Sequence, residues 1–317
     1  MTVDRPRLTA TAPSAAIDGV LVIDKPPGMT SHDVVVAARR LLAQPRIGHT
    51  GTLDPMATGV LPLACGLATR LVSFLTASDK EYIAEIRFGL TTDSYDVTGK
   101  ATGGTGAFPD RATILDGLQV FSGDYLQAPP PISAKKIGGR RAYELARNGT
   151  PVQPAPVPVH VETLNLIASD GAVATVRVRC SAGFYVRALA HALGQRTGTG
   201  ACLQSLRRVR SGDFTISNAL PIEDLHSTPD KVASHTVPLD SLLPHLPTAV
   251  LTADGEVHVS HGRDIGPDQV LGAWLGSGLE SSGAASWVRL VSTTGCLLAM
   301  AQPGATPDVL HPSVVLG

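Results

Sequence analysis

Charged residues and long apolar runs are both scarce in this chain of 317 residues. Only 17% of the residues are charged and 43% are hydrophobic, a balance that excludes a chain disordered throughout. The longer apolar runs, 60–65 and 20–23, fall far short of the roughly 18 residues that cross a bilayer. Residues 1–18 lack the continuous apolar core of a secretory signal, so we expect a flexible tail there and no membrane attachment.

Motifs of several common enzyme classes are also missing. The four cysteines, at positions 65, 180, 202 and 296, form no CxxC pair and no spacing with histidine that a zinc site would need. Neither a metal site nor a disulfide framework is expected, and a reducing cytoplasm suits such a protein. The patterns GxxxxGK(S/T) and HExxH are absent, which leaves a nucleotide hydrolase and a metal hydrolase without support.

Charge is distributed unevenly along the chain. Its net value is −1, but residues 211–317 hold three basic and eleven acidic residues, so the first 210 residues carry +7. Within them, 177–210 contains seven arginines and no acid, and 135–147 contains five basic residues and one acid. Such segments are typical of surfaces that bind a phosphate backbone, although solvated protein faces carry the same pattern.

The order of the predicted elements favours an α+β fold with a largely antiparallel or mixed sheet. Strands are expected at 19–24, 80–90 and 173–180, the last two from the alternation of apolar and polar residues. Helices are expected after Ser31, which we assign as an N-cap, and over 184–196. These elements show no regular alternation of strand and helix, which argues against a doubly wound parallel sheet.

Proline and a change in composition mark two further boundaries. Proline-rich stretches at 128–131 and 151–158 bracket the basic segment 135–147 and predict a separate lobe. A break in composition near 246–247 introduces the acidic end of the chain, which is long enough for a small β-rich domain.

One carboxylate stands out in a glycine-rich loop. The segment 48–59 holds three glycines and a proline between two apolar stretches, and Asp54 lies in it. An aspartate there is explained either as a turn or cap residue or as a reactive group where the backbone must approach a ligand closely. The loop by itself leaves both explanations open.

Several blocks of the sequence resemble, in the same order, the signature of the TruB-type tRNA pseudouridine synthases. They are GHTGTLDPMATGVL at 48–61, KEY at 80–82, TDSYD at 92–96, SAGFYVR at 181–187 and LQSLRR at 203–208. With the opening at 19–29, they are spread over most of the length of residues 19–210. The resemblance implies the pseudouridine synthase fold, a mixed central sheet flanked by helices, with a C-terminal domain similar to a PUA module. It also implies that the substrate is the T-loop uridine of tRNA at position 55.

The resemblance assigns catalytic roles to three residues. Asp54 matches the catalytic nucleophile, and Arg187 matches the arginine that pairs with it. Tyr82 matches the tyrosine that stacks on the target base and handles its C5 proton. Isomerisation of uridine by an anionic carboxylate needs no metal and no organic cofactor, so none is expected. Without the resemblance, a phosphate contact would explain Arg187 and a core position would explain Tyr82.

Four more residues match positions that bind the substrate in this family. Tyr185 and Leu206 match positions that line the uridine pocket. His49 matches the histidine that packs into the space left by a flipped nucleotide. Asp96 matches a carboxylate near the base edge, although a turn at the end of a strand explains it equally well.

Seven basic residues are predicted to contact the RNA backbone: Lys25, Lys135, Lys136, Arg140, Arg141, Arg207 and Arg208. For Lys25, a structural role is the alternative. Segment 128–155 falls where the family carries a mobile thumb that closes over the T-arm. The implied organisation is a tail over 1–18, a catalytic domain over 19–245 and a PUA-like domain over 246–317.

The expected partner is the T-arm of tRNA. A monomer without an obligatory protein partner is our default, because the sequence shows no internal repeat and no heptad pattern. Two other functions stay open at this point. One is an RNA chaperone that binds and refolds tRNA, and the other is a non-tRNA or guide-RNA-dependent synthase that needs partner proteins.

Overall fold

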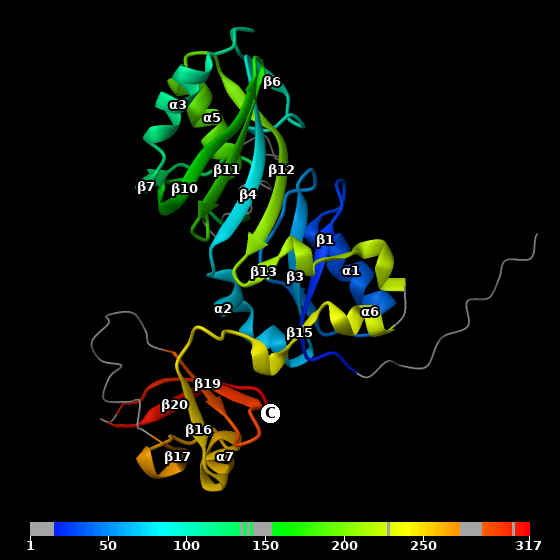
Figure 1. Cartoon of the computed structure of the whole chain (residues 1–317), viewed down its shortest axis with the longest axis vertical. Coiled ribbons are helices and arrows are strands. Elements are labelled where there is room, and N and C mark those ends of the chain that lie inside the picture. Colours follow the sequence, from blue (N-terminus) through cyan, green and yellow to red (C-terminus); the bar gives the residue numbers. More distant parts are fainter. Residues whose placement is uncertain are drawn as a thin grey trace, which may run out of the picture.

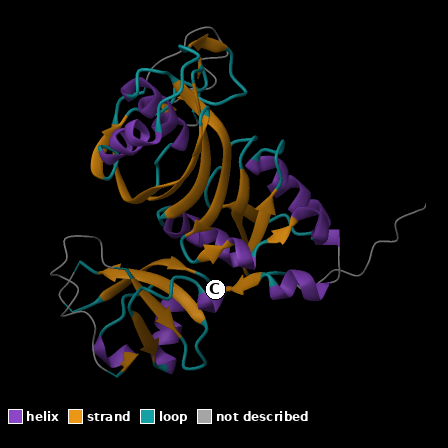
Figure 2. Ribbon diagram, turned by 45° about the horizontal axis from the view of Figure 1, so that its top comes forward, coloured by secondary structure: helices purple, strands orange, loops and turns teal. Residues whose placement is uncertain are grey.

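The structure is a computed structural model that describes residues 16–133, 136–137, 140–141, 154–226, 229–272, 287–305 and 308–317. Its described residues form a large mixed sheet with helices on its faces and a smaller sheet near the C-terminus (Figure 1). The strands of the large sheet bend strongly along their length (Figure 2). The predicted α+β class, the mixed sheet and the β-rich C-terminal part are confirmed.

The bounds of the elements are as follows. The first part of the chain forms β1 (Gly19–Lys25), α1 (Ser31–Leu41), β2 (Ile47–His49), β3 (Thr58–Cys65), α2 (Val72–Thr76), β4 (Lys80–Phe88), β5 (Thr91–Thr92), β6 (Ala101–Gly103), α3 (Arg111–Gln119), β7 (Gly123–Gln127), β8 (Lys136–Ile137) and β9 (Arg140–Arg141). The middle forms β10 (Val157–Asp170), β11 (Val173–Cys180), α5 (Val186–Arg196), β12 (Ala201–Ser211), β13 (Phe214–Thr215), β14 (Leu220–Pro221), α6 (Pro229–Ser234) and β15 (Thr236–Pro238). The C-terminal part forms β16 (Thr248–Leu251), α7 (Ala253–Ser260), β17 (Val270–Leu271), β18 (Val288–Val291), β19 (Leu297–Pro303) and β20 (Leu310–Val315).

Strand β12 lies in the middle of the large sheet. The order of the strands is β14-β1-β3-β12-β4-β11-β10-β7, and β2, β13 and β15 pair beside this path. β12 runs parallel to β3 on one side and antiparallel to β4 on the other. It therefore joins the half of the sheet that holds β1 and β3 to the half that holds β4, β10 and β11.

Strand β1 is buried on both faces, because a hydrophobic core lies on each side of it. Leu21 and Ile23 belong to the core that also contains residues of α1, α3 and α5. Val20 and Val22 belong to the second core, which lies on the other face of the strand. This burial explains why residues 20–23 of β1 are all apolar rather than alternating with polar residues.

The predicted elements agree with the structure at their centres and differ at their ends. The strand predicted at 173–180 is β11, and the one predicted at 80–90 is β4, which ends at Phe88. The N-cap of α1 is Thr30, not Ser31: the Thr30 hydroxyl accepts a hydrogen bond from the Asp33 backbone N–H at 3.0 Å. Ser31 is buried instead.

The chain becomes part of the folded body earlier than predicted. The Gln44 side-chain amide donates to the Ile17 carbonyl at 2.8 Å and accepts from its N–H at 2.9 Å. The Asp18 carboxylate accepts from the Leu67 backbone N–H at 2.7 Å. The predicted tail over 1–18 is therefore wrong at its C-terminal end, and its residues 1–15 lie outside the described residues.

The C-terminal sheet shares a core with the large sheet. It has the order β17-β16-β18-β19-β20, begins at Thr248 and lies next to α2 (Figure 1). Val291, Met300 and Leu316 belong to the same buried cluster as Val20 and Val22 of β1. The rings of Phe74 and Trp287 meet edge to face with centroids 4.6 Å apart, and the packing therefore continues from one sheet to the other.

Candidate active site

The loop between β2 and β3 holds Asp54 between two anchored neighbours. The Ser31 hydroxyl accepts from the Leu53 backbone N–H at 2.8 Å and donates to the Leu53 carbonyl at 3.1 Å. On the other side, the Pro55 carbonyl accepts from the Gly28 N–H at 2.8 Å. The backbone of Asp54 is thus fixed from both directions, although the segment is rich in glycine.

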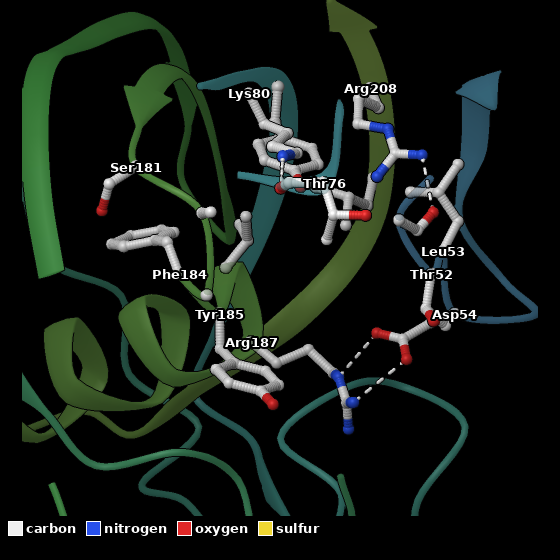
Figure 3. Close-up of a pocket in the computed structure, with 16 residues that line it drawn as sticks. Thr52, Leu53, Asp54, Thr76, Lys80, Ser181, Phe184, Tyr185, Arg187 and Arg208 are labelled. Atoms are coloured by element: carbon white, nitrogen blue, oxygen red, sulfur yellow. Dashed lines mark hydrogen bonds and ion pairs between the residues drawn. The ribbon is translucent and has the colours of Figure 1, made fainter. Parts of the chain in front are cut away.

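Asp54 and Arg187 form a two-pronged ion pair across the site (Figure 3). The Arg187 Nε lies 2.8 Å from Asp54 Oδ2, and its Nη2 donates to Oδ1 at 3.1 Å. The third nitrogen, Nη1, donates to the carbonyls of Ser94 and Ile132, each at 3.0 Å. Because every nitrogen of the guanidinium has a partner, the fork has one orientation, and it keeps the carboxylate aimed.

Asp96 is a second carboxylate on the same arginine. Its Oδ2 lies 3.6 Å from Arg187 Nη1, and its Oδ1 accepts from the Ser94 hydroxyl and the Thr98 N–H, each at 2.9 Å. The side chain is 7% exposed, whereas that of Asp54 is 34% exposed. Asp96 faces Arg187 and is not among the residues that line the cavity of Tyr82. The geometry supports a role in fixing Arg187. Asp96 also lines the neighbouring groove with His49 and Asp54, and its place near the base edge stays a prediction.

A cavity of about 360 Å³ opens beside the Asp54 carboxylate. Tyr82 on β4 and Leu206 on β12 line it, together with Tyr185 just before α5. The register of β4 and β12 pairs Leu206 with Ala84 and Arg208 with Tyr82, so these side chains share one face of the sheet. Residues distant in the sequence thereby line one cavity with Asp54.

Both tyrosines of the cavity carry a neutral phenol. Burial raises the pKa of Tyr82 and also that of Tyr185. The Gln127 side chain holds the backbone of Tyr185: its Oε1 accepts from the Tyr185 N–H at 2.8 Å, and its Nε2 donates to the carbonyl at 3.1 Å. Gln127 therefore fixes the backbone of Tyr185 at the start of α5.

His49 lies in a groove next to this cavity. The groove has a volume of about 800 Å³ and also contains Asp54, Pro55 and Lys100. Burial lowers the pKa of His49, and the nearby charge of Arg208 lowers it further. The imidazole is thus a neutral, half-buried ring beside the loop of Asp54.

Two basic residues predicted to contact the RNA backbone are buried instead. Lys25 has no exposed surface, and its ammonium donates to the carbonyls of Pro26 at 2.8 Å and Met29 at 2.7 Å. Arg208 is 1% exposed. The prediction is wrong for both, because a side chain held inside the protein cannot meet a phosphate at the surface. Arg207 is 41% exposed and forms a two-pronged pair with Asp24, at 2.8 and 3.2 Å.

The acid-free stretch 177–210 is not a row of free cations. Six of its seven arginines have carboxylate partners from elsewhere in the chain, and these pairs are Arg177 with Glu81, Arg179 with Asp79 and Glu162, Arg187 with Asp54 and Asp96, Arg196 with Asp116, Arg207 with Asp24, and Arg210 with Glu81. The charges along the chain predict a phosphate-binding surface here, but strands, loops and a helix from elsewhere in the fold supply carboxylate partners that the local sequence does not show.

The second basic segment is described only in part. Strands β8 and β9 pair with each other, and Lys136 lies opposite Arg141. The side chains of Lys136, Arg140 and Arg141 lie outside the described residues, as do Lys135 and most of the predicted thumb over 128–155.

Lys80 lines the cavity and received no role from the sequence. It is 6% exposed, and its ammonium donates to the Thr76 carbonyl at 2.5 Å. Burial lowers its pKa to about 8, with the charge of Arg208 acting in the same direction. Its position two residues before Tyr82, on the apolar face of the strand, is the signal that could have indicated a buried lysine. Among the described residues, no group of three or more histidine, cysteine, aspartate or glutamate side chains could hold a metal ion.

The family models and the relatives that match this chain all carry the names of pseudouridine synthases. A model described as TruB family pseudouridylate synthase (N terminal domain) matches residues 39–186, and one described as tRNA pseudouridylate synthase B C-terminal domain matches 187–249. A tRNA pseudouridine synthase B from Solibacter usitatus is 43% identical over 303 residues, 95% of this chain and 100% of that protein. The protein of the same name from Azoarcus sp. is 38% identical over 291 residues, 89% of this chain and 97% of its own.

A solved Cbf5-Nop10-Gar1 complex contains a chain of similar fold. Its TM-score is 0.72 at 26% identity, and the match covers 94% of this chain and 85% of that one. Neither family match extends beyond residue 249, so the PUA-like character of the C-terminal sheet stays a prediction. The identity over nearly the whole length decides the assignment: the chain belongs to the TruB family of pseudouridylate synthases.

Proposed function

We propose that this protein converts the T-loop uridine of tRNA, at position 55, into pseudouridine, with Asp54 as the attacking carboxylate. The observation that carries the proposal is the Asp54–Arg187 pair at the mouth of a cavity lined by Tyr82, Tyr185 and Leu206. The names of the full-length relatives support tRNA as the substrate.

The reaction exchanges one bond and moves one proton. The bond between N1 of the base and C1′ of the ribose breaks, the base turns, and C5 bonds to C1′. The proton on C5 leaves and N1 gains one, so there is no net oxidation and no hydrolysis. A fixed carboxylate suits this chemistry, either by attacking the sugar or by taking a proton from it. Arg187 keeps Asp54 oriented, and two backbone carbonyls keep Arg187 in place.

Access to the uridine requires that it leave the T-loop. Unstacking a base costs a few kcal/mol, about 2–4, and protein groups that fill the vacated space offset part of that cost. His49 is suited to this role, because its neutral planar ring lies in the groove beside the cavity. Tyr82, Tyr185 and Leu206 then provide an aromatic and apolar site for the flipped base.

The enzyme is proposed to act alone, as a monomer in the cytoplasm. The Cbf5 neighbour was solved as a complex with Nop10 and Gar1, whereas the relatives that match this chain along most of its length carry the name tRNA pseudouridine synthase B, which mentions no partner. No described helix is long and apolar enough to cross a membrane.

The test is conversion of an unmodified tRNA transcript by the purified protein alone, mapped at nucleotide resolution. The wild type is expected to form pseudouridine at the T-loop position, and Asp54→Asn is expected to bind the transcript and form none. A wild type that binds and refolds tRNA but changes no uridine would support the RNA chaperone instead. Activity that appears only after a cell extract is added would support a partner-dependent synthase.

A further inference from the structure

Arg208 stands apart from the other six arginines of 177–210. Within the described part of the chain, no carboxylate oxygen lies within 4.0 Å of its guanidinium, whereas each of the others has such a partner. It is nevertheless more buried than any of them, at 1% exposure. A buried cation without a counter-ion is unfavourable, so its position calls for a compensating role.

Two backbone carbonyls hold the guanidinium in one place. Nε donates to the Val60 carbonyl at 2.7 Å, and Nη2 donates to the Gly51 carbonyl at 3.1 Å. Gly51 belongs to the loop of Asp54, and Val60 belongs to β3. The backbone of Arg208 is equally confined: a Cβ added to Gly59 would lie 2.2 Å from the Arg208 carbonyl oxygen. The residue therefore connects the catalytic loop to the middle of the sheet.

The side chain of Arg208 also shares a cavity with Tyr82. The two residues are directly opposed in the register of β12 and β4, and both line the cavity beside Asp54. Figure 3 shows Arg208 and Asp54 at this cavity. Burial raises the pKa of the Tyr82 phenol, and the positive charge of Arg208 acts in the opposite direction. A guanidinium only donates hydrogen bonds, so the phenol oxygen can face it only as an acceptor.

Building on the proposed isomerisation, we propose that Arg208 is a positioning residue for Tyr82. It fixes the phenol oxygen as an acceptor and stabilises the phenolate that forms when the Tyr82 phenol gives its proton to water. The C5–H bond of the base then breaks, its electron pair restores the double bond between C5 and C6, and the proton goes to the phenolate oxygen. The proton given to water is matched by the one that water delivers to N1, and Tyr82 ends as the neutral phenol it began as, so atoms and charge balance.

The experiment measures single-turnover release of tritium from C5 of a labelled tRNA transcript between about pH 6 and about pH 9. Arg208→Gln is expected to slow release about 100-fold or more, the loss typical of one preorganised donor, with an unchanged Kd for the transcript. The rising limb of the pH profile should move to higher pH, because the phenol loses its stabilising cation. Arg210→Gln is the control: Arg210 lies on the same strand, pairs with Glu81 at 3.7 Å and does not line the cavity.

A double-mutant cycle separates this role from a purely structural one. In a Tyr82→Phe background, Arg208→Gln should cost little further, because the hydroxyl it acts through is gone. Arg208→Lys keeps the charge, so it should lose less than Arg208→Gln and leave the pH limb in place. If Arg208→Gln does not fold, Arg208→Lys is compared in the wild-type and Tyr82→Phe backgrounds in its place. Equal losses in both backgrounds by an active enzyme would overturn the inference alone, whereas a wild type that converts no uridine would overturn the proposed function and the inference with it.

Discussion

Replacing Arg187 by methionine removes the cation that two carboxylates share. Asp54 loses both prongs of its pair, at 2.8 and 3.1 Å, and Asp96 loses the charge 3.6 Å away. Asp96 dominates the effect on stability, because its side chain is only 7% exposed and water cannot solvate it. Removing one partner of such a buried pair costs about 3–5 kcal/mol. At about 2–4 °C for each kcal/mol, the melting temperature should fall by about 6–20 °C.

The assay is thermal and denaturant unfolding, combined with tRNA conversion by whatever fraction remains folded. Arg196→Gln is the matched control, because Arg196 lies on the same helix and pairs with Asp116 at 3.8 Å on the surface, where a pair contributes less than about 1 kcal/mol. Adding Asp96→Asn to Arg187→Met should restore part of the lost stability, because it removes the uncompensated charge. Stability within about 1 kcal/mol of the wild type for Arg187→Met, or no gain from Asp96→Asn, would refute this account.

Three further outcomes are expected. The pKa of His49 is lowered in the folded state, so below about pH 6.5 the unfolded chain binds more protons than the folded protein and acidification destabilises the fold. In denaturant titrations over that pH range, the free energy of unfolding of His49→Gln should depend less on pH than that of the wild type. Gly59→Ala should destabilise by more than about 2 kcal/mol, because φ is +100° and the new Cβ meets the Arg208 backbone, whereas Gly171→Ala, with φ of +46° and open space around it, should cost about 1 kcal/mol or less. Met300→Ala should lower the free energy of unfolding by about 2–5 kcal/mol, because it leaves a cavity at a fully buried position. A melting temperature equal to that of the wild type would contradict the shared core.

Local sequence patterns predicted the strands and helices well, and the family resemblance named site residues that lie close together in the structure. Alternation of apolar and polar residues located β4 and β11, because burial of one strand face is a local property. Asp54 and Arg187 are 133 residues apart, and no spacing rule connects them; only the resemblance did.

The errors concern burial and pairing of charged side chains. Lys25 reads as a surface lysine in the sequence, but three backbone carbonyls, including that of Pro55 at 3.2 Å, surround its ammonium inside the protein. Arg177 has no acid near it in the chain, but Glu81 of the neighbouring strand lies 3.3 Å away. Both depend on which strands become neighbours, and that information lies in the tertiary structure rather than in any local window.

The central place of β12 has a consequence for how the protein is made. The ribosome releases β3 and β4 long before β12, which begins at Ala201, yet the halves of the sheet are joined only when β12 enters between them. Leu206 and Arg208 arrive with that strand, and Arg187 only shortly before it. Pairing over such distances along the chain is slow, because the loop between the partners must close first. A nascent chain therefore stays inactive until about two thirds of it has been synthesised, and a translation pause before this strand would expose the edges of β3 and β4 together.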